Sequence, residues 1–282
     1  MIRAVRLPAL CLALLLGCSG AAAGQLEELR RAGRLDISAG IQPTTGIVPG
    51  QRARLTLEIA TDRWFTGGTR ISIPEVPGLV ILQTEQFASN ASETRDGQTW
   101  VIQRWTLDVF AQRAGSFTIP PIALQLQVNS DEQGDIQGQI FSPQTRMDVT
   151  LPDSLADVTA WVAAPEFTVR QRFDREPDAL QVGDALQREV VFEAADVMAM
   201  MLPAFEAEKP EGLAAYSDPP VLDNSNNRGQ ARARRSVQIS YVAESPGTYT
   251  LPAREYFWWD TNRARLELVS LPEVQVLSLI HI

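Results

Sequence analysis

Hydrophobic and polar residues alternate along most of this chain. The clearest runs set each apolar residue between polar neighbours: Ile37, Ala39 and Ile41, then Leu55, Leu57 and Ile59. A period of two is the pattern of a half-buried β-strand, whereas an amphipathic helix repeats every 3.6 residues. Further strands are expected near residues 69–73, 79–85, 100–110, 116–128 and 139–151. About seven short strands separated by turn residues are typical of an immunoglobulin-like sandwich.

One ten-residue stretch occurs twice. Residues 111–120 (AQRAGSFTIP) are echoed by residues 243–252 (AESPGTYTLP) at a constant offset of 243 − 111 = 132. A period this long exceeds that of a solenoid repeat and suits a duplicated domain. Gly115 and Gly247 stand third of four residues in each copy, where a type II turn needs a positive φ. The sequence therefore predicts two copies of one β module, each with such a turn.

The second copy aligns with the first at its core positions. Six residues are expected to point inward: Trp105, Leu107 and Val109 in the first copy, and Val237, Ile239 and Tyr241 in the second. In many sandwiches a tyrosine at a strand corner donates its hydroxyl to the backbone a few residues upstream. Tyr249 can make this hydrogen bond, and Phe117 at the matching position cannot.

The predicted architecture is all-β, with two tandem immunoglobulin-like β-sandwich domains after an N-terminal signal segment. The expected boundaries follow the chain: signal peptide 1–23, charged leader 24–34, first sandwich 35–151, linker 152–165, second sandwich 166–276 and tail 277–282. The tail reads like the translation of a sequencing-library adapter, so we expect it to be non-native. The natural protein would then continue beyond it.

The first 23 residues have the pattern of an export signal. Arg3 and Arg6 precede a short apolar core, and three alanines at residues 21–23 offer a cleavage site. Residues 15–18 (LLGC) also resemble a bacterial lipobox, in which Cys18 would be lipidated. The other cysteine, Cys11, lies in the same segment, so the mature domains are expected to hold no internal disulfide. We predict an exported protein, either periplasmic or a lipoprotein.

Composition narrows the class of function. The chain is 45% hydrophobic and 21% charged, which is typical of a globular protein, and its net charge of −9 argues against nucleic acid as a partner. Its one histidine, His281, lies in the suspect tail, which removes most catalytic triads and zinc sites. No catalytic residue, metal or cofactor is predicted. The sequence leaves open a glycosidase with paired carboxylates, although its acidic clusters read as solvated loops.

The run Tyr256, Phe257, Trp258, Trp259, Asp260 is the most unusual stretch. Successive side chains of a strand point to opposite faces, so alternate aromatics are left outside the core or under a loop. Exposed aromatics anchor protein interfaces and stack on sugars. We therefore name Tyr256, Trp258, Trp259 and Asp260 as candidate partner-binding residues. The alternative is that these side chains cover a domain joint or the open end of the sandwich.

Several motifs of the second module resemble the BatD family of bacterial aerotolerance operons. They are residues 180–184 (LQVGD), 201–203 (MLP), 210–213 (PEGL), 245–252 (SPGTYTLP) and 258–260 (WWD). In the first module the resemblance is carried by residues 115–120. The resemblance implies tandem immunoglobulin-like domains that face the periplasm from a C-terminal membrane helix. It also implies partners, namely von Willebrand A-domain proteins and a MoxR-type AAA+ ATPase.

The leading functional expectation is a non-enzymatic interaction protein of the bacterial envelope, anchored at the inner membrane in its full-length form. Its role in stress or oxygen tolerance is implied by the resemblance alone. The alternative is a carbohydrate-binding module that stacks sugars on Trp258 and Trp259.

Overall fold

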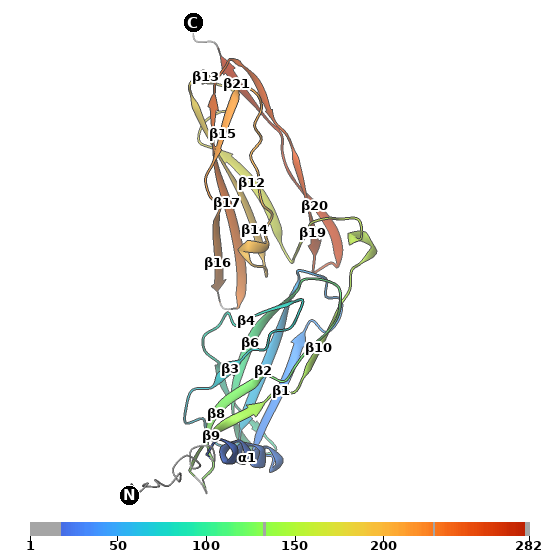
Figure 1. Cartoon of the computed structure of the whole chain (residues 1–282), viewed down its shortest axis with the longest axis vertical. Helices are drawn as coiled ribbons and strands as arrows, with labels where there is room; N and C mark the ends of the chain where they lie inside the picture. The colour runs from blue at the N-terminus through green and yellow to red at the C-terminus, as the bar shows by residue number, and fades with distance from the viewer. Residues whose placement is uncertain (1–17, 132–133, 228, 280–282) are drawn as a thin grey trace, which may run out of the picture. The chain divides into compact units, whose positions relative to one another are not determined.

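The computed structural model describes residues 18–131, 134–227 and 229–279 (Figure 1). They form an all-β, immunoglobulin-like fold, as the alternating pattern predicted, with one α-helix among the described residues. The chain divides into two compact units. The first comprises Met1–Thr44, Ala53–Val109 and Ser116–Met147, and the second comprises Thr45–Arg52, Phe110–Gly115 and Asp148–Ile282.

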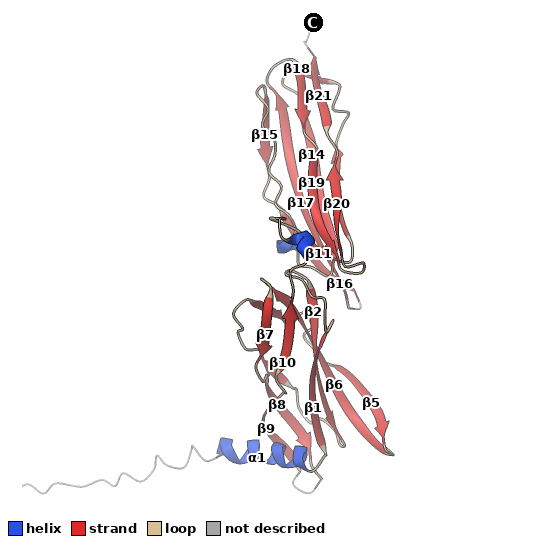
Figure 2. Ribbon diagram, turned by 90° about the vertical axis from the view of Figure 1, so that its right-hand side faces the viewer, coloured by secondary structure: helices blue, strands red, loops and turns tan. Residues whose placement is uncertain are grey.

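The described residues of the first half of the chain form the helix and ten strands. In chain order they are α1 (Cys18–Arg31), β1 (Leu35–Gln42), β2 (Arg52–Thr61), β3 (Arg70–Ser72), β4 (Leu79–Leu82), β5 (Ser89–Arg95), β6 (Gln98–Ala111), β7 (Gly115–Ile119), β8 (Ala123–Asn129), β9 (Asp135–Phe141) and β10 (Thr145–Val149). Helix α1 lies against β9 and β1 (Figure 2). Its side chains Leu26 and Leu29 are buried there. The charged leader is thus helical over residues 24–31.

In the second half, the residues that the structure describes form eleven strands and two 3₁₀ turns. In chain order they are η1 (Asp153–Leu155), β11 (Val162–Ala164), β12 (Phe167–Phe173), β13 (Leu180–Gln181), β14 (Ala185–Ala195), η2 (Ala199–Met201), β15 (Leu213–Ser217), β16 (Val221–Asn227), β17 (Gln230–Ala243), β18 (Gly247–Leu251), β19 (Arg254–Asp260), β20 (Arg265–Leu271) and β21 (Val274–Leu279). The segment predicted as a linker thus contains η1 and β11. Leu277–Leu279, at the start of the suspect tail, complete β21, while residues 280–282 with His281 lie outside the described residues.

The same strand order occurs in both halves. One five-stranded sheet has the order β1-β2-β6-β4 with β5 also paired to β6, and the other has β12-β14-β17-β15 with β16 also paired to β17. Strands β6 and β17 each have 14 residues and begin 230 − 98 = 132 positions apart. Strands β7 and β18 each have five residues and the same burial pattern. The repeat read from the sequence is therefore also a repeat of strand pairing.

The alternating residues form the cores. Strand β1 pairs with β2 so that Ile37 faces Ile59 and Ile41 faces Leu55, and all four are buried. The six positions aligned between the two copies are buried as well, with exposed fractions of 7% or less. The prediction that these six point inward is confirmed. Since each removes most of its side chain from water, together they contribute several kcal/mol to each core, at about 1.5–3 kcal/mol per large apolar side chain.

The turn predicted at the repeated glycines is wrong. The φ of Gly115 is +142°, well away from the value near +80° that a type II turn requires, and the φ of Gly247 lies outside the positive range. Both glycines are instead the first residues of strands, β7 and β18. The chain enters an extended strand directly at this point, so the glycine does not occupy a left-handed turn position.

The tyrosine corner is confirmed. The Tyr249 hydroxyl donates to the carbonyl oxygen of Ser245 at 2.7 Å, and lies 3.0 Å from the Ser245 hydroxyl. This bond ties the start of β18 to the turn that precedes it. Phe117, at the matching position of β7, has no hydroxyl for the same bond.

Candidate functional site

The predicted aromatic run lies on β19, and its members differ widely in exposure. Phe257 is 39% exposed, whereas Trp259 is 5% and Asp260 is 2% exposed. Tyr256 and Trp258 are half-buried. The residue with the most accessible side chain in this run is therefore Phe257, which the alternation argument had not singled out.

Tyr256 and Trp258 pack against the core of the second unit. The Tyr256 ring meets Phe192 edge to face at 5.1 Å between centroids, and Trp258 lies 6.5 Å from Phe167 in a tilted arrangement. Edge-to-face aromatic pairs contribute about 0.5–1.5 kcal/mol beyond the area they bury. These two side chains thus have a packing role, and a role in binding a partner stays a prediction.

Trp259 lies on the opposite face of β19 from Tyr256 and Trp258, whereas Asp260 ends the strand on the same face as those two residues. Trp259 packs with Leu155 and Ala163, which belong to η1 and β11. The Asp260 carboxylate accepts hydrogen bonds from the backbone N–H of Asn262 at 2.9 Å and of Arg263 at 3.1 Å, so it closes the turn between β19 and β20. The short strand β11 pairs in parallel with β19 as its neighbour in the same sheet. Tyr256, Trp258 and Trp259 are therefore partly or fully covered by packing, while Phe257, on the same face as Trp259, is 39% exposed.

A buried charged network is the feature of the second unit that the sequence prediction missed. The side chain of Arg188 on β14 is 0% exposed, and its guanidinium donates to Glu208 at 2.9 Å and to Gln171 at 2.9 Å. The Tyr241 hydroxyl donates to the same Glu208 carboxylate at 3.1 Å, and Arg254 donates to its other oxygen at 2.8 Å. The sequence does hold one sign of this network. In the alternation of β14, Arg188 occupies an inward position between Leu186 and Val190.

Aromatic rings surround the two arginines of this network. The Arg188 guanidinium carbon lies 5.1 Å from the centroid of Phe205 and 5.9 Å from that of Phe173. The Arg254 guanidinium lies 4.7 Å from the same Phe205 ring. Cations within about 6 Å of a ring face are attracted by its quadrupole, which offsets part of the cost of burying them.

The charges and the burial of the network act on its titratable groups in different directions. Burial raises the pKa of the Glu208 carboxyl, but a hydrogen bond from its own backbone and the charges of Arg188 and Arg254 outweigh this and leave the pKa below its usual value. Burial raises the pKa of Tyr241 to about 12. Glu208 is therefore a carboxylate and Tyr241 a neutral hydroxyl at physiological pH, as their hydrogen bond requires.

Three of the motifs that carry the family resemblance meet around the turn between β17 and β18. Gly183, at φ +94°, donates its N–H to the carbonyl of Ala243 at 2.8 Å, and Glu244 donates to the carbonyl of Gly212 at 2.9 Å. Gly212 has a φ of +88°, and a Cβ there would meet the Ser245 hydroxyl and come within 2.7 Å of the Tyr249 hydroxyl. Only glycine fits both the backbone conformation and the space. These motifs thus build one corner of the fold.

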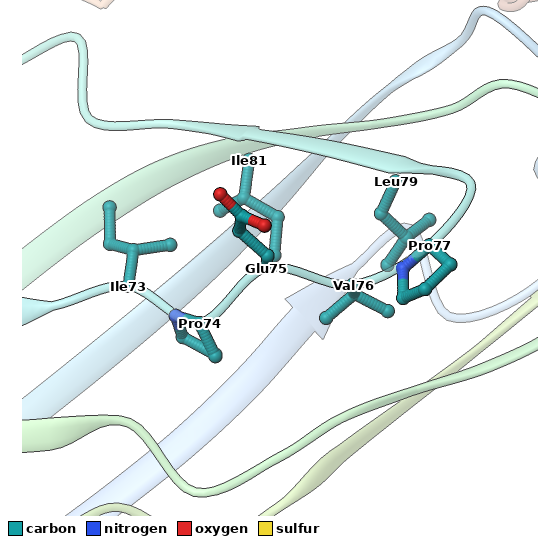
Figure 3. A pocket seen from close by; sticks show the side chains of 7 residues that line it. All are labelled: Ile73, Pro74, Glu75, Val76, Pro77, Leu79 and Ile81. Atoms are coloured by element: carbon teal, nitrogen blue, oxygen red, sulfur yellow. The ribbon is translucent and has the colours of Figure 1, made fainter.

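An open groove lies in the first unit beside β4 (Figure 3). It has a volume of about 530 Å³ and is lined by Ile73, Pro74, Glu75, Val76, Pro77, Leu79 and Ile81. A turn closed by the bond from Leu79 N–H to the Val76 carbonyl, 3.0 Å long, brings residues 73–77 alongside the strand. Strand β4 ends the path of its sheet. The groove therefore combines apolar side chains, one carboxylate and a sheet edge.

Some expectations fall outside what the structure describes. Residues 1–17, which hold most of the expected signal, are not among the described residues, and Cys18 is the first residue of α1. Cleavage of a signal and lipidation at Cys18 stay predictions. Across residues 18–131, 134–227 and 229–279, no helix has the length and apolar character needed to cross a membrane. In the same ranges no three His, Cys, Asp or Glu side chains are grouped to hold a metal ion.

The fold defines an immunoglobulin-like, all-β protein. Residues 42–137 match the family model described as BatD, BatD DUF11 like domain, so the resemblance to the BatD family predicted from the sequence is confirmed over this span. The matched span lies in the first module and includes the groove beside β4. The motifs that carried the resemblance in the sequence lie mostly in the second module. The chain matches no curated protein.

Two solved structures are similar to the chain only at low levels. One is the surface layer protein SbsC, domains 4–9, with 13% identity over 87% of this chain and 32% of that chain, and a TM-score of 0.18. The chain thus spans about a third of the length of that structure. The other is a conserved domain protein from Bacillus anthracis, with 9% identity over 86% of this chain and 91% of that chain, and a TM-score of 0.19. Similarity at this level carries no argument about function.

Proposed function

We propose that this chain is a non-enzymatic interaction protein of a BatD-like aerotolerance system in the bacterial envelope. The observation that carries the proposal is the BatD domain match over residues 42–137. The expected partners are von Willebrand A-domain proteins that act together with a MoxR-type ATPase. The protein is exported and faces the periplasm, with an inner-membrane anchor in its full-length form or a lipid on Cys18.

The groove beside β4 is the surface proposed to meet the partner, because it lies within the matched span. An extended segment of a partner can add to the edge of a sheet through main-chain hydrogen bonds, while side-chain pockets supply specificity. Val76, Leu79 and Ile81 offer such apolar pockets here, and Glu75 offers a negative charge at their side. In the second unit, the aromatic run on β19 can add to an interface mainly through Phe257, since Trp259 and Asp260 are almost fully buried.

Affinity capture from a native membrane extract tests the proposal. The tagged chain is expected to retain a von Willebrand A-domain protein, and Val76→Asp is expected to lower its recovery by about tenfold, which corresponds to the loss of 1.4 kcal/mol of binding free energy. Val80→Asp is the matched control, because Val80 lies on the same strand as Leu79 and Ile81 but points to the other face. Recovery of no von Willebrand A-domain protein by the parent chain would contradict the proposed function.

A separate experiment tests the route of export. Metabolic labelling with a fatty acid is expected to mark the parent chain but not Cys18→Ala if Cys18 is lipidated. An unlabelled parent whose mature N-terminus follows residue 23 supports the cleaved signal peptide instead. A chain recovered from the cytoplasm with residues 1–23 intact would contradict export.

A further inference from the structure

The turn η2 concentrates the methionines of the chain. The sequence has five methionines, and three of them are Met198, Met200 and Met201. Two of these lie in η2 itself, and Met198 precedes it directly as the N-cap. Of the other two, Met147 is 2% exposed in the first unit, and Met1 lies outside the described residues. Three thioether side chains thus stand within four consecutive residues.

The backbone of this turn is held firmly while its thioethers remain accessible. Ala199 is 0% and Leu202 is 2% exposed, so both are anchored in the core of the second unit. The Ala199 N–H donates to the Asn224 side-chain oxygen at 2.8 Å, and Arg235 donates to the Leu202 carbonyl at 3.2 Å. By contrast, Met200 is 72% exposed. The anchoring contacts therefore do not depend on the Met200 side chain.

The methionines on either side of Met200 have intermediate exposure. Met198 and Met201 are half-buried. The turn packs against β16, where Leu222 is 47% exposed on the same face of the strand as Asn224. We call Met198, Met200 and Met201 together the methionine patch.

We propose that the methionine patch is a site of reversible oxidation by peroxide. In the reaction the O–O bond of hydrogen peroxide breaks, one oxygen atom bonds to the thioether sulfur, and water leaves. The sulfur is oxidised by two electrons and the peroxide is reduced. The product, methionine sulfoxide, is polar, and reductases specific for its two epimers restore the thioether. The inference goes beyond the proposed function and does not depend on it.

Oxidation changes the surface in two stages. At Met200 the added oxygen points into water, so the fold is unaffected while the patch loses its most exposed apolar side chain. At Met198 and Met201 the added oxygen enters a half-buried position, where a polar group without a partner is unfavourable. Peroxide therefore first makes the exposed part of the patch polar, and at higher dose it places polar groups at the two half-buried positions of the turn.

Peptide mass spectrometry of the purified chain tests the order of reaction. After timed exposure to hydrogen peroxide, Met200 sulfoxide is expected to form first, Met198 and Met201 sulfoxides next, and Met147 sulfoxide roughly tenfold more slowly than that of Met200, since oxidation follows exposure. Methionine sulfoxide reductases A and B are expected to return Met200 to the thioether. Equal rates at Met147 and Met200, or failure of both reductases, would overturn the proposal.

Retention on a hydrophobic-interaction column tests the change of surface. The oxidised parent is expected to elute earlier than the untreated parent. The variant with Met198→Leu, Met200→Leu and Met201→Leu keeps an apolar patch that peroxide cannot oxidise, so its retention is expected to stay constant. Met147→Leu is the matched control and is expected to shift as the parent does. An equal shift of the triple variant, or no shift of the fully oxidised parent, would contradict the proposal.

Discussion

At the position where the first unit places Leu55, the second unit places Arg188. Leu55 faces Ile41 in the pairing of β1 with β2, and Arg188 faces Phe173 in the pairing of β12 with β14. One strand further, Val109 of β6 corresponds to Tyr241 of β17. All four of Leu55, Val109, Arg188 and Tyr241 are 0% exposed. One core is thus apolar at a place where the other buries a cation, a carboxylate and a hydroxyl.

The comparison shows that a shared strand order does not require a shared chemistry of the core. Strand pairing depends on alternation, and Arg188 keeps the inward phase that a leucine would have. The desolvation of a buried ion pair can exceed its Coulombic gain, so the presence of the network is weak evidence that it stabilises the fold. Its aromatic neighbours Phe173 and Phe205 lower the cost of keeping it.

The largest expected effect comes from removing one charge of the network. Glu208→Gln leaves the Arg188 guanidinium buried without its carboxylate, and we expect a loss of about 3 kcal/mol of stability, as is common when one partner of a buried pair is removed. Urea unfolding, with hydrogen exchange followed in β14 and β17, measures it. Glu211→Gln on the exposed side of the same segment is the control and is expected to be neutral. A neutral Glu208→Gln would show that the network contributes no stability.

A second variant replaces the buried charges of the second core by apolar residues like those of the first core. Arg188→Leu combined with Glu208→Leu is expected to recover most of the stability lost in Glu208→Gln, because apolar replacement of a buried pair is often neutral or stabilising. A double variant less stable than Glu208→Gln would mean that the packing around Phe205 needs the guanidinium itself.

The next effect concerns the corner of the second unit. Gly212→Ala forces a Cβ into a left-handed backbone position and against the Tyr249 hydroxyl, so we expect a loss of about 2 kcal/mol. Gly97→Ala separates the two causes, because Gly97 has a φ of +79° and open space around its Cβ position. Thermal unfolding should show a smaller loss of stability for Gly97→Ala than for Gly212→Ala. Equal losses would show that the contact with the Tyr249 hydroxyl does not contribute.

A smaller effect is expected at the tyrosine itself. Tyr249→Phe gives β18 the aromatic residue that β7 already has and removes the bond to Ser245, at a cost of about 1 kcal/mol. Tyr216→Phe serves as the control, since Tyr216 is 63% exposed. Chemical denaturation should distinguish the two variants, and an unchanged midpoint for Tyr249→Phe would contradict the role given to this bond.

The smallest expected effect is a difference in acid sensitivity. The pKa of Glu208 is lower in the folded chain than its ordinary value of 4.5, so its contribution to stability is present above that pH and is lost as pH falls through the folded pKa. Glu58 in the first unit also has a lowered pKa, chiefly through its hydrogen bond with Arg104, but Arg104 is well exposed. Glu208→Gln should therefore flatten the acid side of the stability profile more than Glu58→Gln. The opposite ranking would assign the acid response to the first unit.

Much of the fold could be predicted from alternation and repetition, because both reflect backbone pairing directly. The six inward positions aligned between the two copies follow from the spacing of apolar residues. The hydrogen bond of the Tyr249 hydroxyl follows from the type of residue at that corner. The turn at Gly115 and Gly247 was wrong because glycine is compatible with several backbone conformations, and composition alone does not choose among them.

The candidate site was harder to predict. The sequence of an aromatic run does not indicate which other segment packs against it. Trp259 packs with Leu155 of η1 and Ala163 of β11, which lie about a hundred residues away in the chain. The network was missed because its members are scattered along the sequence from Gln171 to Arg254. The groove beside β4 likewise depends on how residues 73–77 turn back on the strand.

The buried arginine also bears on how the chain avoids misassembly while it folds. Neighbouring modules with the same strand order are at risk of exchanging equivalent strands, a typical failure of repeat proteins. If β14 took the place of β2, Arg188 would enter a core whose matching positions hold Ile41 and Val109, with no carboxylate to receive it. Such a swapped product carries an unpaired buried charge and is strongly disfavoured. The difference between Leu55 and Arg188 at this inward position is thus expected to disfavour the exchange of β2 and β14 between the modules.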